Sequence, residues 1–96
     1  MNFGSEIRKL RISKGLLIRE LAAALKTDSA TISKIERGSR NATKEQVIML
    51  AKLFNQEQDK MMALWLGTKV YDLLKDDPTA GQALNEAQKM YKTKKE

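Results

Sequence analysis

The residues best placed to do chemistry are small polar and basic side chains gathered in residues 16–38 (LLIRELAAALKTDSATISKIERG). The apolar spacing predicts two short helices joined by a tight turn. We expect the second helix to present four side chains outward: Ser29, Thr31, Ser33 and Lys34. A helix enters the DNA major groove only when its leading face is slim and exchanges hydrogen bonds with base edges. The pattern favours that chemistry modestly over a plain helical hairpin with a solvated polar face.

Other chemistries are disfavoured by the residue types that the chain lacks. It contains no cysteine and no histidine, which removes disulfides, thiolate metal sites, most zinc sites and the commonest general base. The sequence also has no cluster of carboxylates and no glycine-rich phosphate loop. We therefore expect a protein that is not an enzyme and that needs no metal or cofactor.

Positive charge is concentrated in the first half of the chain. The net charge is +6, and residues 1–44 contain ten lysines and arginines against four acids, whereas residues 45–96 contain eight of each sign. Such a one-sided excess is typical of proteins that bind a polyanion, although it also serves solubility. The N-terminus does not resemble a signal peptide, and no run approaches the roughly 20 apolar residues of a membrane span. We expect a cytoplasmic protein without membrane association.

The elements that must position these side chains are all predicted to be helices, because no stretch alternates apolar and polar residues as a strand does. We expect helices over residues 4–14, 18–25, 28–37, 43–54, 57–75 and 80–92, with a frayed end at 92–96. Asp28 and Thr43 are the expected N-caps, Thr43 forming a capping box with Gln46. Gly15 and Gly38 follow the first and third helices, where left-handed residues are common.

Residues 15–43 (GLLIRELAAALKTDSATISKIERGSRNAT) resemble the lambda-repressor-like, Cro/CI-type (XRE) helix-turn-helix domain. The resemblance covers residues 3–66 and includes I-R-K-L-R-x-x-K-G, R-E-L-A and I-S-K-I-E-R-G. Within that family, I-E-R-G-S-R-N-A-T is most similar to the controller proteins of restriction-modification systems. The resemblance implies an all-α fold with a five-helix DNA-binding domain over residues 1–66 and a C-terminal helical extension over residues 67–96.

The resemblance also implies roles for individual residues in binding double-stranded DNA. The side chains implied to lie along the base-facing side are Ser29, Ala30, Ser33 and Lys34, beside the outward Thr31. Those implied to contact the backbone or neighbouring bases are Arg37, Arg40, Asn41 and Thr43. Arg11 and Glu36 match a pair that ties the first helix to the third.

Two positions depart from the family pattern at the start of the second helix. Ile18 stands where the family usually has a glutamine that contacts DNA, and Leu17 replaces the usual Ser or Thr N-cap. We expect Arg19 to compensate through a phosphate contact. Because Ser29 and Ala30 are short, we also expect DNA shape to contribute to specificity.

The fifth predicted helix is more apolar than one small core requires. Its expected dimerisation face is centred on Trp65 and Leu66 and comprises Met62, Trp65, Leu66, Val70 and Leu73. In the alternative, the sixth helix folds back and covers this face.

Three functional interpretations remain open. The leading one is a homodimeric, sequence-specific transcriptional regulator that binds a two-fold-symmetric operator. A restriction-modification controller is a narrower form of the same function. A different class is an antitoxin in which residues 57–96 bind a protein partner, a toxin.

Overall fold

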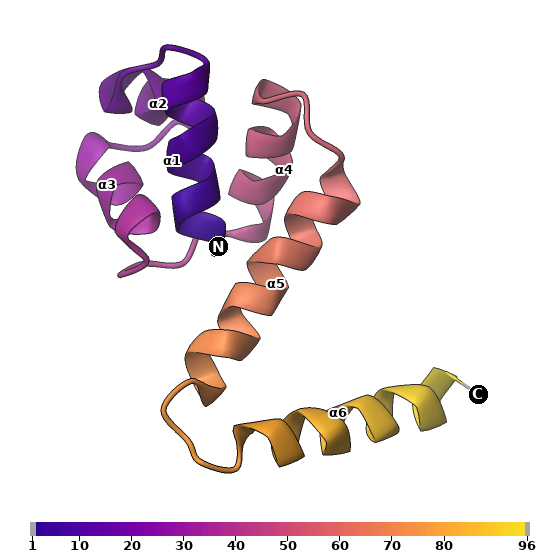
Figure 1. The fold of residues 1–96 in the computed structure, drawn as a ribbon. Coiled ribbons are helices and arrows are strands. Elements are labelled where there is room, and N and C mark those ends of the chain that lie inside the picture. Colours follow the sequence, from indigo (N-terminus) through magenta and orange to yellow (C-terminus); the bar gives the residue numbers. More distant parts are fainter. Residues whose placement is uncertain (1, 96) are drawn as a thin grey trace.

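In the computed structural model, which describes residues 2–95, the chain forms helices and no strand within that range. The helices are α1 (Phe3–Ser13), α2 (Ile18–Ala24), α3 (Ser29–Arg37), α4 (Lys44–Leu53), α5 (Gln58–Leu74) and α6 (Ala80–Lys95). Figure 1 shows α1 to α4 gathered together, α5 leading away from them, and α6 projecting from the far end of α5. This arrangement confirms the all-α prediction, with a helical extension that follows the fifth helix.

Local hydrogen bonds define the ends of the helices that carry the candidate site. The Asp28 carboxylate accepts from the Thr31 backbone N–H at 2.7 Å, which confirms the predicted N-cap of α3. Thr43 and Gln46 form the predicted capping box, with the Gln46 N–H 3.1 Å from Thr43 Oγ1 and the Thr43 N–H 2.9 Å from Gln46 Oε1. Gly38 has a φ of 82°, a left-handed conformation that ends α3.

The predicted helix bounds agree with the structure to within about two residues everywhere except at the end of α6. There the expected fraying from residue 92 is wrong, because the helix continues to Lys95. Lys92 and Lys94 lie in its last turn, where positive charge is favourable beside the C-terminal end of the helix dipole. The Thr93 hydroxyl also donates to the Lys89 carbonyl at 3.0 Å.

One hydrophobic core joins α1 to α4 and the first half of α5. The buried apolar residues are Phe3, Ile7, Leu21, Ala22, Leu25, Ile32, Ile35, Ala42, Val47, Leu50, Ala51, Phe54, Met61 and Trp65. The second half of α5 leaves this core, because Leu66, Val70 and Leu73 are exposed. Between residues 2 and 95, none of the helices combines the length and the hydropathy of a membrane-spanning segment.

The assignment of Trp65 to a dimerisation face is wrong. Its side chain is only 8 % exposed and belongs to the core. The indole Nε1–H donates to the Ala42 carbonyl at 3.0 Å, and Lys69 Nζ lies over the ring, 3.9 Å from its centroid. An indole N–H that is buried needs an acceptor, and the loop after α3 supplies it.

A close approach of α1 to α3 depends on Gly4. A Cβ atom at this position would lie 2.3 Å from the Ile35 carbonyl oxygen and 2.8 Å from that of Glu36. Both obstacles are backbone atoms of α3, so they cannot move aside as a flexible side chain could. Gly67, in the middle of α5, has open space at the same position.

We predict opposite effects from the same substitution at these two glycines. Gly4→Ala should destabilise the protein by about 1–3 kcal/mol or more, because it forces α1 away from α3. Gly67→Ala should raise stability by up to about 1 kcal/mol, because alanine favours a helix interior. Urea unfolding followed by circular dichroism measures both. Equal stability of wild type and Gly4→Ala would contradict the close approach described above.

Candidate nucleic-acid interface

The α3 helix has one buried side and one open side. Ile32 and Ile35 fix it against α1 and α2, which both pack on α3. Ser29, Ala30 and Lys34 are exposed on the opposite side. The first turn of α3 therefore presents two short side chains, with one lysine a turn further on. This is the slim leading face that major-groove entry requires.

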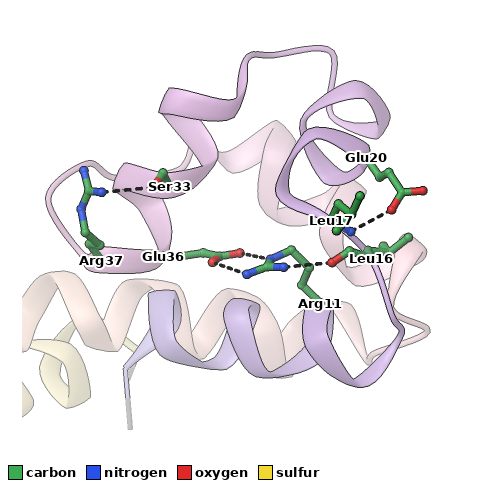
Figure 2. A network of polar contacts seen from close by, with 7 residues as sticks. All are labelled: Arg11, Leu16, Leu17, Glu20, Ser33, Glu36 and Arg37. Carbon is green, nitrogen blue, oxygen red and sulfur yellow. Dashed lines mark hydrogen bonds and ion pairs between the residues drawn. The ribbon is translucent and has the colours of Figure 1, made fainter.

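The outward orientation predicted for Thr31 is wrong. Its side chain is only 7 % exposed, because it lies one turn before the buried Ile35 and beside Ile32 on the helix. Ser33 is half-buried, and its hydroxyl accepts a hydrogen bond from Arg37 Nη1 at 3.1 Å. Figure 2 shows this contact at one end of the polar network on α3. Thr31 therefore belongs to the packing of α3, and the open face is smaller than the sequence indicated.

The loop after α3 is anchored so that its polar side chains point away from the core. Ala42 is buried and its carbonyl accepts from Trp65. The residues on either side of it, Asn41 and Thr43, are exposed, as is Arg40. The hydrogen bond from Trp65 to this loop was not predicted from the sequence. The signal that could have indicated it is the polar N–H of the indole ring, because a buried N–H needs an acceptor.

Electrostatic effects on Asp28 connect the start of α3 with this loop. Hydrogen bonding from the backbone and side chain of Thr31 lowers the pKa of the Asp28 carboxyl below its ordinary value. The positive charges of Arg40 and Lys34 lower that pKa further. Arg40 and Lys34 therefore lie close enough to act on one carboxylate, and together with Arg37 they give the exposed side of α3 an excess of positive charge.

A buried ion pair holds α3 against α1. Arg11 Nε lies 2.7 Å from Glu36 Oε2, and Arg11 Nη2 donates to Glu36 Oε1 at 3.1 Å. Arg11 Nη1 donates to the Leu16 carbonyl at 2.9 Å, as Figure 2 shows. The two side chains are only 11 % and 5 % exposed, and hydrogen bonding to Glu36 raises the pKa of Arg11 above its ordinary value. The predicted tie between the first and third helices is confirmed.

The start of α2 has no side-chain N-cap. Leu17 has no side-chain oxygen, and its own backbone N–H is instead bound by Glu20 Oε1 at 2.8 Å. Ile18 is half-buried, whereas Arg19 is exposed at the beginning of the helix. Arg19 is therefore free of the core and available to a ligand.

A basic hollow lies between α1, the beginning of α2 and α3. Arg8 and Arg37 line it together with Ser33 and the Arg11–Glu36 pair. Because Arg11 and Glu36 neutralise each other, the hollow carries the two positive charges of Arg8 and Arg37. Arg8 is not among the residues predicted from the sequence, although its position one turn before Arg11 on α1 is the signal that could have indicated it. Among residues 2–95, no three Asp or Glu residues gather as a metal site.

Comparison with known proteins decides the family. A family described as helix-turn-helix matches residues 7–57, which is more than half of the chain. The chain belongs to the XRE-type helix-turn-helix family. This family consists of DNA-binding transcriptional regulators and is generally non-enzymatic. The predicted resemblance is therefore confirmed, and the matched residues include all of α2, α3 and α4.

Individual relatives of this helix-turn-helix protein extend the comparison. It is 39 % identical over 62 residues to an uncharacterised HTH-type transcriptional regulator of Bacillus subtilis, RghRB, and the match covers 64 % of this chain and 45 % of the relative. The chain thus spans less than half the length of that relative. The restriction-modification controller protein C.AhdI of Aeromonas hydrophila is 32 % identical, with a TM-score of 0.56, over 62 % of this chain and 86 % of the controller.

A further solved structure shows similarity of fold alone. The clp gene regulator ClgR of Corynebacterium glutamicum is 21 % identical with a TM-score of 0.58, over 88 % of both chains. The overall fold of this chain is therefore found in another solved protein.

We predict that the Arg11–Glu36 pair can be tested separately from any DNA contact. Arg11→Ala or Glu36→Ala leaves a buried charge without its partner, which costs roughly 3–5 kcal/mol in strong cases. Thermal unfolding without DNA should show a lower melting temperature for both variants. The matched control is Glu86→Ala, which breaks the exposed Glu86–Lys89 pair and should change little. Wild-type melting of Arg11→Ala together with lost DNA binding would instead make Arg11 a DNA-contacting residue.

Proposed function

We propose that this protein is a sequence-specific transcriptional regulator that binds a two-fold-symmetric DNA operator as a homodimer. The observation that carries the proposal is the exposed leading face of α3, with Ser29, Ala30 and Lys34 open to solvent. It is flanked by exposed basic and polar residues in a chain of the helix-turn-helix family. This combination fits a helix that enters the major groove while its surroundings bind the backbone.

Base readout would come from the first two turns of α3. The lysine at position 34 fits the O6 and N7 acceptors of guanine, and the Ala30 methyl fits a thymine methyl. Ser29 can exchange hydrogen bonds with either kind of base edge. Because two of these three side chains are short, direct contacts would read only a few base pairs. Sequence-dependent DNA shape would supply part of the specificity.

Backbone binding would come from residues around α3. The Thr43 hydroxyl accepts from the Gln46 N–H, which leaves its own proton to donate to a phosphate at the N-terminal end of α4. Arg40 and Asn41 extend the same side in the loop before α4. On the other side of α3, Arg37 and Arg8 line the basic hollow, which suits a second phosphate. Exposed Arg19 at the start of α2 would bind a third.

The homodimer is supported by the uncovered end of α5. Leu66, Val70 and Leu73 are 51 %, 44 % and 80 % exposed, and their spacing places them on one stripe of the helix. A single recognition helix reads too few base pairs to find one site in a genome. Two-fold pairing would place two α3 helices about 34 Å apart, one turn of DNA, on inverted half-sites.

A restriction-modification controller is the narrower form of this function. It is supported by the 32 % identity with C.AhdI and by the segment I-E-R-G-S-R-N-A-T, which runs from the last turn of α3 to Thr43. The gene next to this one tests it directly. A methyltransferase or endonuclease gene there supports a controller, whereas a small toxin gene favours the antitoxin alternative.

We predict that Lys34 and Thr43 affect DNA binding differently. Lys34→Ala should change the preferred sequence, with about 1–3 kcal/mol lost at the position it reads. Thr43→Ala should weaken binding to all duplexes about equally, because a phosphate contact carries no sequence information. Selection from a random duplex pool, followed by titration of the selected and scrambled sequences, measures both.

Thr43→Ser is the control, since it keeps both the hydroxyl and the cap of α4. A uniform loss of affinity in Lys34→Ala, with no change in the selected sequence, would refute the base-reading role of Lys34.

We also predict that a charge on the exposed stripe of α5 produces monomers. Leu66→Lys should halve the mass measured by light scattering at micromolar concentration, while circular dichroism stays helical. Ile12→Lys is the matched control, since Ile12 on α1 is 56 % exposed but lies outside the stripe. A wild-type mass near 11 kDa, with one subunit bound per operator, would contradict the dimer.

A further inference from the structure

The α6 helix stands apart from the chain although it has an apolar side. Figure 1 shows it leaving the end of α5, and no helix within residues 2–95 packs along its length. Leu84 on that side is 50 % exposed, and Ala80 and Ala87 lie on the same side by helical spacing. A lone helix of its 16 residues is marginal in water, because most helical stability comes from packing of an apolar face. We therefore expect another molecule to pack against the apolar side of α6.

The uncovered part of α5 is too short to hold a dimer by itself. A stable interface involves roughly 20–30 residues on each side, whereas only residues 66–74 of α5 extend beyond the buried Trp65. The 16 residues of α6 continue from that segment after a short turn. The exposed stripe of α5 and the apolar side of α6 together form a larger surface than either alone, which points to a second copy of this chain as the partner.

Charge is distributed unevenly between the two ends of α6. The turn before it is acidic, because Asp76 and Asp77 are exposed. The charge of the nearby Asp72 is neutralised by an ion pair with Lys75 at 3.7 Å. The far end is basic, because Lys92 and Lys94 are exposed. The charge of Lys89 is neutralised by an ion pair with Glu86 at 3.3 Å.

This distribution selects one orientation for a pair of α6 helices. Two parallel copies would bring lysines beside lysines and aspartates beside aspartates. Two antiparallel copies bring each acidic turn beside the lysines of the other chain. Opposite charges that meet across an interface fix its register and disfavour the alternative arrangement.

We propose that α6 pairs antiparallel with α6 of a second copy, with Asp76 of each subunit beside Lys92 of the other. In this pairing we place Leu84, the large apolar residue on this side of α6, at the two-fold axis. Ala80 and Ala87 lie on the same side of α6 as Leu84, and their small side chains allow the helices to approach closely. The inference rests on the proposed homodimer, which it extends from α5 to α6.

Cross-linking tests the position of the axis directly, because the chain has no cysteine of its own. Leu84→Cys should form a disulfide-linked dimer rapidly under mild oxidation. Gln82→Cys is the matched control, since it is exposed two residues away on the opposite side of α6. Preferential cross-linking of Gln82→Cys, or no cross-linking of either variant in a chain that sediments as a dimer, would overturn the pairing.

Charge exchange tests the orientation without disturbing apolar contacts. Asp76→Lys and Lys92→Glu should each raise the dimer dissociation constant about tenfold, because each places like charges together at both ends of the pair. The double variant should restore the wild-type constant, as measured by analytical ultracentrifugation. Single variants that dimerise as tightly as wild type would overturn the proposal.

These measurements separate this inference from the homodimer on which it rests. A chain that loses its dimer in Leu66→Lys but is unaffected by Asp76→Lys and Lys92→Glu dimerises through α5 alone. That result would overturn the α6 pairing and leave the proposed function intact. A wild-type chain that sediments as a monomer would contradict both.

Discussion

The rest of the structure depends on the bidentate contact between Arg11 and Glu36. Arg11 comes from α1 and Glu36 from α3, and the third nitrogen of the same guanidinium binds the Leu16 carbonyl just before α2. The Arg11 side chain thus connects α1 with α3 and with the residue that precedes α2, and these three helices present the candidate interface. Because both groups are buried, either one alone would be an uncompensated charge. The pair therefore specifies the orientation of α3 as well as stabilising it.

Local chemistry made much of the fold predictable. The caps at Asp28 and Thr43 and the left-handed Gly38 depend on residues close together in the chain, so they could be read directly. The polarity of Thr31 predicts an exposed side chain, but its position one turn before the buried Ile35 places it on the packed side of α3. For Trp65, periodicity shows that α5 is apolar on two sides, but it does not show which side packs into the core. The side that carries Trp65 packs there, because its indole N–H binds the carbonyl of Ala42, which is distant in the sequence.

The candidate interface consists of a small surface that would contact base edges and a larger, positively charged surface around it that would contact phosphates. The open side of α3 offers short side chains and one lysine, whereas arginines and polar residues surround it on α1, α2 and the loop before α4. Burial of Thr31 makes the reading surface smaller than the sequence indicated. Phosphate contacts and DNA shape therefore have the larger part in the proposed function, and pairing of two subunits becomes the means of reading enough base pairs.

The central claim is that the basic first half of the chain faces the phosphates of a DNA duplex. The most direct test is the affinity for a selected duplex, followed by fluorescence anisotropy from low to physiological salt. Neutralising about six phosphates per subunit predicts a log–log slope near −5 per bound subunit. A slope indistinguishable from zero would show that these charges only solvate the surface, and it would contradict the account.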